Sequence, residues 1–101
     1  MATPYKLSPS EAKRKILLIL EEGTVDFSLH CRRDSMPEAH VDDVDMVNVL
    51  RDGQIIREAE WDTHHENWKY RVEGADTEGE ELTAITIIFE EDLSLLVVTV
   101  F

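Results

Sequence analysis

The chain has 101 residues, a length that suits one domain with its own hydrophobic core and needs no metal or disulfide cross-link. Its single cysteine, Cys31, excludes an internal disulfide and a cysteine-based zinc site, and no apolar run is long enough for a membrane span or a signal peptide. The formal net charge of −12 arises from residues 41–101, because residues 1–40 hold equal numbers of acidic and basic side chains. We therefore expect one cytoplasmic domain, residues 1–101, without cofactor or metal, whose acidity disfavours non-specific binding of nucleic acid.

The first helix is expected over residues 9–22. Ser8 can cap its N-terminus, and Glu11 completes a capping box. Gly23 follows as a stop signal. Apolar residues recur at helical spacing within these limits, namely Ala12, Ile16, Ile19 and Leu20.

Two further helices are expected before the main sheet. Residues 24–28 are short and β-prone, and residues 29–36 are typical of a short helix that ends at Pro37. Asp42 then begins a helix that ends at Gly53, with acidic residues in its first turn. The expected core stripe of that helix is Val44, Val47 and Leu50.

Four strands are expected in the second half, at residues 54–59, 68–73, 82–89 and 95–101. The second alternates apolar and charged residues, as a half-exposed strand does, while the last two are almost continuously apolar and belong at the sheet centre. Acidic turns connect the last three strands. The predicted fold is an α+β domain with N-terminal helices packed on one face of a four-stranded antiparallel β-sheet.

His30 and Arg33 are three residues apart and share a face if residues 29–36 are helical. An imidazole can move a proton to or from a ribose 2′-hydroxyl or a leaving oxygen, and a guanidinium can hold the phosphate. The alternative is structural, with His30 packed on the sheet and Arg33 paired with Asp34 or Glu38.

The strand at residues 68–73 places Lys69 and Arg71 on its polar face and Trp68 and Tyr70 on the other. The two cations predict either a phosphate groove on the open face of the sheet or cross-strand pairing with neighbouring acids. The two aromatic residues are expected in the core.

Adjacent histidines at His64 and His65 raise the question of a metal site. Side chains of neighbouring residues in extended chain point to opposite sides, and no helical histidine pair or second cluster completes a tetrahedron. We expect a polar loop there. A metal-binding module remains the third alternative for function, and it predicts melting that depends on metal.

Several stretches in a fixed order carry a family resemblance: EEG at 21–23, FSLHCRRDSM at 27–36, VNVLRDGQII at 47–56, NWKYRVEG at 67–74 and VTVF at 98–101. Through them residues 7–101 resemble small bacterial domains of unknown function grouped near the MqsR and RelE-like toxins. The resemblance implies the helix-plus-sheet fold of metal-independent endoribonuclease toxins, which are partnered by an antitoxin. It also implies that His30 and Arg33 match the family's histidine and following arginine, and that Arg71 matches its basic strand position.

The chain departs from that pattern in two ways. Ala39 and His40 stand near the place of a second arginine that the family commonly has, and the domain is far more acidic than toxins that cut RNA on ribosomes. The leading hypothesis is a toxin-like, metal-independent endoribonuclease, of full, weak or lost activity. His30 would be its general acid or base, Arg33 and Arg71 its phosphate ligands, and Tyr70 or His40 its assistants.

The rival hypothesis is a non-catalytic protein-interaction domain of the same fold, which binds through an open edge strand or an acidic helix. The acidic second half favours it, whereas the basic residues around His30 favour the ribonuclease. The expected partners are RNA as substrate and an antitoxin or another protein, with no membrane, and the chain itself is expected as a monomer or weak dimer.

Overall fold

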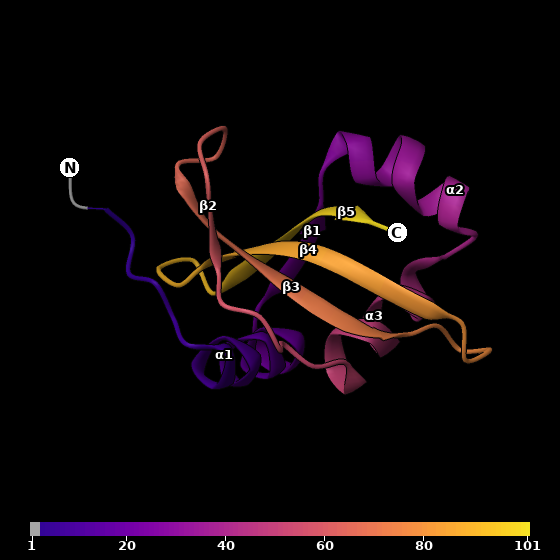
Figure 1. Ribbon diagram of the computed structural model, residues 1–101, viewed down its shortest axis with the longest axis horizontal. Coiled ribbons are helices and arrows are strands. Elements are labelled where there is room, and N and C mark those ends of the chain that lie inside the picture. The colour runs from indigo at the N-terminus through magenta and orange to yellow at the C-terminus, as the bar shows by residue number, and fades with distance from the viewer. Residues whose placement is uncertain (1–2) are drawn as a thin grey trace.

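One open, mixed β-sheet with strand order β1-β5-β4-β3-β2 organises the protein in the computed structural model, which describes residues 3–101 (Figure 1). Neighbouring strands from β2 to β5 run antiparallel, whereas β1 runs parallel to β5. The strands are β1 (Thr24–Phe27), β2 (Glu60–Asp62), β3 (Asn67–Ala75), β4 (Glu81–Phe89) and β5 (Ser94–Val100). The helices are α1 (Pro9–Glu22), α2 (Met36–Ala39) and α3 (Asp43–Asp52), with a π-helical segment η1 (Cys31–Ser35) before α2. The α+β class is confirmed.

The prediction of a four-stranded antiparallel sheet was wrong, because β1 joins the sheet as a fifth strand. Thr24 pairs with Ser94 and Phe27 with Val97, so the partners are seventy residues apart in the chain. Local pattern marks a strand but carries no information about so distant a partner. Gly23 permits the approach at the start of β1, where an added Cβ would lie 2.0 Å from the Leu93 carbonyl oxygen.

The helix α1 has the limits and the capping box that the sequence predicts. The Glu11 amide donates to Ser8 Oγ (3.2 Å), and the Ser8 amide donates to a carboxylate oxygen of Glu11 (2.9 Å). Ala12, Ile16 and Ile19 are fully buried against the sheet. Local signals within the first turn and after the last turn therefore specify the limits of this helix.

Pro37 does not end a helix, contrary to expectation, but lies in the first turn of α2. In an α-helix its ring would clash with the carbonyl of the residue four positions earlier, which is Arg33. The chain avoids the clash by widening into the π turn of η1, in which the Met36 amide donates to the Cys31 carbonyl.

The helix α3 begins at Asp42 as predicted, with reciprocal hydrogen bonds between Asp42 and Asp45. The predicted core stripe was wrong in two of three positions, since Val44 and Val47 are 66% and 41% exposed. Its buried apolar residues are Met46, Val49 and Leu50. The sequence offers two apolar stripes on this helix, and packing on β3 and β4 selects the one that includes Met46.

The strand expected at residues 54–59 was also wrong. It is reduced to a single bridge between Gln54 and Glu73, and the chain then runs as a loop to β2. Residues 61–67, whose composition predicts a polar connection, instead contribute to β2 and to a tight turn into β3. Trp61 packs edge-to-face on Trp68, with the ring centroids 5.2 Å apart. This aromatic pair across the strands stabilises the hairpin.

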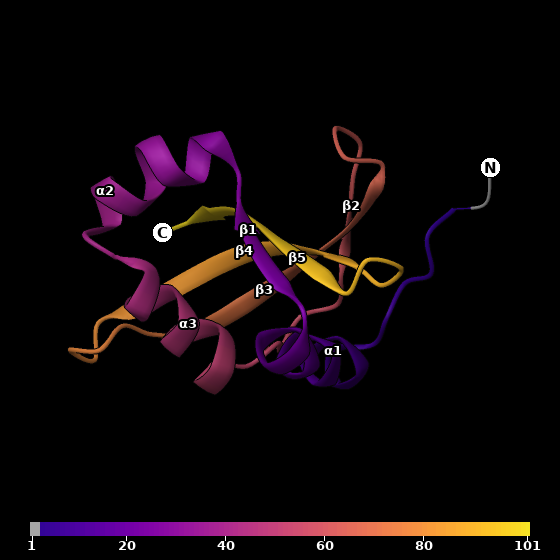
Figure 2. The ribbon, with the colours of Figure 1, turned by 180° about the vertical axis from the view of Figure 1, so that it is seen from behind.

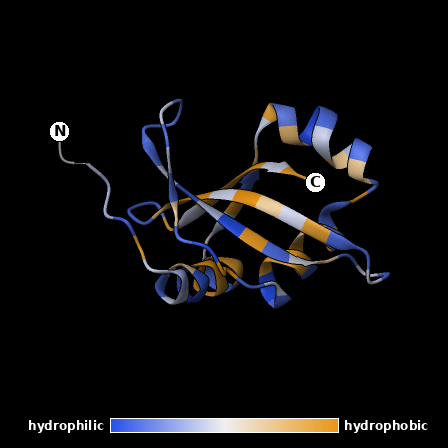
Figure 3. Ribbon diagram, in the orientation of Figure 1, coloured by the Kyte–Doolittle hydropathy of each residue, from blue (hydrophilic) through white to orange (hydrophobic). Residues whose placement is uncertain are grey.

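The helices α1 and α3 cover one face of the sheet, and the other face is open (Figure 2). Apolar and polar bands alternate along β3, whereas β4 is apolar along most of its length (Figure 3). Successive side chains on each strand point to opposite faces. Tyr70 and Val72 are buried on the covered face, while Lys69 and Arg71 lie on the open face. The prediction that all helices pack on one face holds for α1 and α3 alone. In both views η1 and α2 follow the end of β1, and they lie beside the last residues of β5 (Figures 1 and 2).

Candidate functional site

The helical segment after β1, residues 29–35, is fixed to β5 by two serine hydroxyls. Ser28 Oγ donates to the Val98 carbonyl (2.7 Å), and Ser35 Oγ accepts from the Val100 amide (3.2 Å). Both bonds use backbone groups of β5 beyond the residues that pair with β1. The position of this segment relative to the sheet is therefore defined by hydrogen bonds and not by packing alone.

His30 is oriented by a carboxylate on the exposed side of that segment. Its Nδ1 lies 3.2 Å from Asp34 Oδ2, and the imidazole is 62% exposed. When Nδ1 carries the proton and donates to Asp34, Nε2 is left as a free acceptor. Arg32, by contrast, pairs with Asp43 at the start of α3. Because His30 and Arg32 are two residues apart on the helical segment, their side chains face different ways, and His30 does not share the contact with α3. Arg33 is exposed, and within residues 3–101 no carboxylate oxygen lies within 4.0 Å of its guanidinium nitrogens.

A basic groove lies on the open face of the sheet, and we call it the open-face groove. Arg57, Lys69 and Arg71 line it together with Ile85 and Phe101, and its volume is about 170 Å³. The guanidinium carbon of Arg71 lies 5.4 Å from the centre of the Phe101 ring, and Arg71 Nε is buried without a hydrogen-bond partner. Glu58 and Glu60 complete the lining, together with Tyr70.

The cations of the open-face groove form no close ion pair among the described residues, although Glu60 stands opposite Lys69 in the pairing of β2 with β3. Across the part of the chain that the structure describes, no carboxylate oxygen lies within 4.0 Å of the charged nitrogens of Arg57, Lys69 or Arg71. Glu58 is engaged by Lys6 at 3.1 Å. Free cations that converge in a chain of net charge −12 make this groove the clearest site for an anion on the open face.

Tyr70 and Arg71 point to opposite faces, as neighbours on a strand do. The Tyr70 hydroxyl is buried on the covered face, where it accepts a hydrogen bond from the Leu7 amide (2.9 Å). Burial raises the pKa of this phenol. The hydroxyl is thus part of the packing between the N-terminal segment and the sheet, and it is separate from the open-face groove.

His40 lies at the end of α2 in a left-handed conformation, with φ of 57°. It lines a second cavity of about 560 Å³ at the end of the sheet, whose other walls include Asp45, Asp76 and Phe101. Phe101 therefore borders both this cavity and the open-face groove. The acidic walls repel a phosphate, so His40 is not placed with Arg71 around one anion.

The comparisons with known proteins give one result. The domain of unknown function DUF4258 matches residues 27–101. The chain belongs to this family. No curated protein and no solved structure matches the chain.

The part that matches DUF4258 contains every residue of the two candidate clusters, the His30 segment and the open-face groove. It excludes α1 and most of β1. These two clusters lie on opposite sides of the central strand β4, with the His30 segment beside β5 and the groove on β3 near β2. Because β4 lies between β3 and β5, the strand that holds Arg71 is about 10 Å from the strand to which the His30 segment is bonded.

Two groove residues of this DUF4258 chain were missed from the sequence. Arg57 was assigned to a strand, and it reaches the groove because the chain from Gln54 folds back toward β2. Phe101 was counted as the end of a buried strand, yet it lies past β5 and is more than half exposed. Phe101 lies next to Arg71 only because of the order of the strands in the sheet. The sequence therefore gives no direct signal that the two side chains share a groove.

The adjacent histidines of the β2–β3 turn are held by hydrogen bonds to Asp62. Burial opposes ionisation of this carboxyl, but hydrogen bonds from His65 and His64 outweigh it, and the pKa of Asp62 is lowered. Among residues 3–101, no three histidine, cysteine or acidic side chains are grouped as a metal ion would need. The same residues contain no helix that is long and apolar enough to span a membrane.

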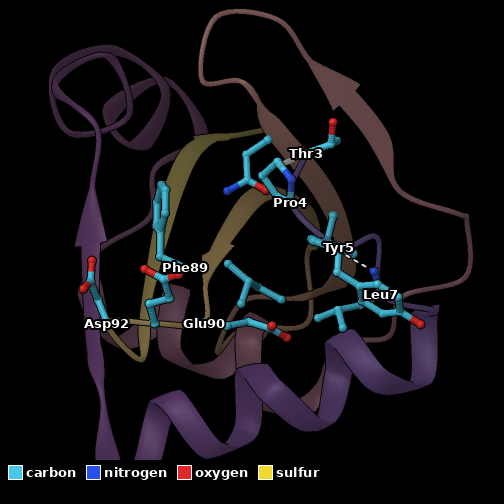
Figure 4. Close-up of a pocket in the computed structure, with 11 residues that line it drawn as sticks. Thr3, Pro4, Tyr5, Leu7, Phe89, Glu90 and Asp92 are labelled. Carbon is cyan, nitrogen blue, oxygen red and sulfur yellow. Dashed lines mark hydrogen bonds between the residues drawn. The ribbon is translucent and has the colours of Figure 1, made fainter. Parts of the chain in front are cut away.

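A further cavity, of about 400 Å³, lies where the N-terminal segment crosses the sheet (Figure 4). Tyr5 and Leu7 form one wall, and Phe89, Glu90 and Asp92 of the β4–β5 turn form the other. The N-terminal segment is held there by the hydrogen bond from Leu7 to Tyr70 and by a bond from Trp68 Nε1 to the Pro4 carbonyl (2.9 Å). Its acidic wall distinguishes this cavity from the basic open-face groove.

Proposed function

We propose that this DUF4258 domain is a toxin-like, metal-independent endoribonuclease that binds RNA across the open face of its sheet. The observation that carries the proposal is the convergence of Arg57, Lys69 and Arg71, none of them paired with an acid among the described residues, in an otherwise acidic chain. Local basic charge of this kind is what an acidic protein needs to bind a phosphodiester backbone.

The groove suits a single-stranded substrate. Guanidinium groups can hold a phosphate through paired hydrogen bonds, and neither Arg57 nor Arg71 forms an ion pair among the described residues. The exposed ring of Phe101 next to Arg71 provides a surface on which a base can stack. Successive phosphates along the strand can then reach Arg33 and His30 on the far side of β5.

His30 supports cleavage by proton transfer. The 2′-oxygen forms a bond to phosphorus while the bond to the 5′-oxygen breaks, which yields a 2′,3′-cyclic phosphate and a 5′-hydroxyl. One proton leaves the 2′-oxygen and one reaches the 5′-oxygen, so no co-reactant is consumed. His30 Nε2, freed by the bond between Nδ1 and Asp34, is the group that moves the proton, and Arg33 stabilises the charge on the phosphate.

FSLHCRRDSM and NWKYRVEG resemble stretches of small bacterial domains of unknown function grouped near the MqsR and RelE-like toxins. This resemblance supports the same activity and implies an antitoxin as partner. The proposal rests on His30, Arg33 and Arg71. The roles predicted for Tyr70 and His40 stay predictions, and the burial of the Tyr70 hydroxyl and the acidic surroundings of His40 give them no support.

The test is cleavage of a mixed RNA pool at low salt in the presence of EDTA. The wild type is expected to cut and to leave 2′,3′-cyclic phosphate ends, and His30→Ala is expected to be slower by about a hundredfold or more. His64→Ala is the matched control, because His64 is an exposed histidine in the distant β2–β3 turn. A folded wild-type protein that leaves RNA intact, or a His30→Ala variant as fast as the wild type, contradicts the proposal.

A second function is favoured by the free edge of β1. This strand pairs with β5 on one side alone, and Thr24 and Asp26 are exposed. An extended peptide from an antitoxin or another partner can add to such an edge, so the domain can act in protein binding without catalysis. Protection of β1 amides from hydrogen exchange on adding a partner would support this function, and unchanged exchange with a bound partner would contradict it.

A further inference from the structure

The helix α1 has a second stripe that faces away from the core. Arg14, Leu17, Leu18 and Glu21 lie on one helical face, because Leu17 and Leu18 follow Arg14 by three and four residues and Glu21 follows Leu18 and Leu17 by three and four residues. Leu17 is 38% exposed and Leu18 is 37% exposed. The core-facing residues of the same helix are others, Ala12, Ile16 and Ile19. Two adjacent leucines at the centre of this stripe therefore keep more than a third of their surface in solvent.

The helix α3 extends this apolar surface. A shallow groove of about 560 Å³ runs between the two helices, with Val47, 41% exposed, on the α3 side. Its lining consists of Arg14, Leu17, Leu18, Leu20, Glu21, Val47 and Arg51. The two leucines and Val47 form a continuous apolar centre with charged groups at its ends, which is the organisation of a protein interface.

The charges at the ends of this stripe are self-complementary. Arg14 and Glu21 lie at equal distances in sequence on either side of the midpoint between Leu17 and Leu18. They are separated by seven residues, which is about 10 Å along the helix axis. Within residues 3–101 neither has an opposite charge within 4.0 Å. A second α1 laid antiparallel across this midpoint meets each Arg14 with a Glu21.

We propose that the outer face of α1 is the contact surface for a second copy of this chain, in a two-fold symmetric dimer. Leu17 and Leu18 of one copy pack on the same residues of the other, and two Arg14 to Glu21 pairs flank them. A two-fold contact requires a surface that is complementary to itself, and this stripe meets that requirement in both its apolar and its charged positions.

The distribution of charge permits a second copy to approach this face. The acidic excess of the chain lies in residues 41–101, whereas α1 carries three basic and three acidic side chains and has no net charge. Two copies that approach through α1 therefore avoid the strongest repulsion between their acidic surfaces. The helix lies on the covered side of the sheet, so the open-face groove stays accessible in both copies (Figure 2). The dimer does not depend on the proposed ribonuclease activity.

The experiment is sedimentation equilibrium of the full chain over a wide range of concentration. We expect a reversible monomer–dimer equilibrium for the wild type. Arg14→Glu and Glu21→Arg each place like charges opposite each other at both ends of the contact, and each is expected to weaken the dimer by about tenfold or more. The double variant R14E/E21R restores the opposite charges and is expected to return to the wild-type dissociation constant.

Lys15→Glu is the matched control, since it makes the same change of charge on the same helix but faces Leu20, not an acid, in the proposed pairing. It is expected to leave the dimer within about threefold of the wild type, a free-energy change below that of one exposed ion pair. Circular dichroism checks that each variant is folded. A wild type that stays monomeric, single variants that dimerise as it does, or a double variant as weak as the single ones would each overturn the proposal.

Discussion

Arg71 of β3 and Phe101, the residue after β5, meet across β4 with 5.4 Å between the guanidinium carbon and the ring centre. The cation and the ring attract each other at this distance, and both side chains line the open-face groove. An arginine held in this way is ordered before a ligand arrives, so little conformational entropy is lost when it binds a phosphate.

Arg71→Met is therefore expected to weaken binding of single-stranded RNA and to lower the slope of log affinity against log salt by about 1, as loss of one phosphate contact does. The measurement is fluorescence anisotropy with a short labelled RNA at several salt concentrations. Arg51→Met is the matched control, because Arg51 lies on α3 and already pairs with Asp52 (3.2 Å). An unchanged salt slope for Arg71→Met would exclude Arg71 as a phosphate ligand.

Asp34→Asn tests whether the carboxylate orients His30. An amide can still accept a hydrogen bond from Nδ1 but no longer stabilises the positive charge that the imidazole gains when it takes a proton. We expect the cleavage rate to fall by about tenfold, equivalent to about 1.4 kcal/mol, with little change in the affinity for RNA. Single-turnover kinetics separate the two quantities. A variant with the wild-type rate would show that His30 acts without Asp34.

Tyr70→Phe separates a structural from a catalytic role of the hydroxyl. The change leaves the Leu7 amide without its acceptor in a buried position, and this costs about 1–3 kcal/mol of the free energy of unfolding. Denaturation by urea measures the cost. We expect the cleavage rate per folded molecule to be unchanged, because the hydroxyl lies on the covered face. A large loss of rate in a variant that is still folded would instead support the predicted catalytic role.

Elements specified by neighbouring residues were predictable from the sequence. The limits of α1 follow from Ser8, Glu11 and Gly23, which act within one or two helical turns. The inward position of Tyr70 and the outward position of Arg71 follow from the alternation of a strand. Such features need no knowledge of what packs on them.

Features that depend on distant partners were not predictable. The pairing of β1 with β5 joins Val25 to Leu95, and the open-face groove joins Arg57 to Phe101. The inward stripe of α3 was missed for the same reason, because Val44 and Val49 are equally apolar and the sheet decides which is buried. The sequence indicates His30 and Arg33 as candidate site residues. Their separation from Arg71 could not be predicted, because it is set by the order of the strands in the sheet.

Asp45 should make the stability of the protein depend on pH in acid. Its carboxylate accepts hydrogen bonds from the Thr77 amide (3.0 Å), the Thr77 hydroxyl (2.9 Å) and the Asp42 amide (3.1 Å). The two bonds from Thr77 connect α3 to the β3–β4 turn. The bond from the Thr77 amide is the largest cause, followed by the bond from Asp42, of a pKa held below its ordinary value. The folded state therefore binds the proton less readily than the unfolded chain does.

The stabilisation from Asp45 is fully present above the ordinary aspartate pKa and is lost as the pH falls through the lower pKa of the folded state. Asp45→Asn should consequently lower the melting temperature most at neutral pH, and the difference from the wild type should shrink steadily in acid. Glu78→Gln is the control in the same turn, since the hydrogen bonds found among residues 3–101 use its backbone amide and not its side chain. Thermal melts between neutral pH and strong acid decide the matter: a difference that stays constant with pH would mean that Asp45 contributes through its shape and not through its charge.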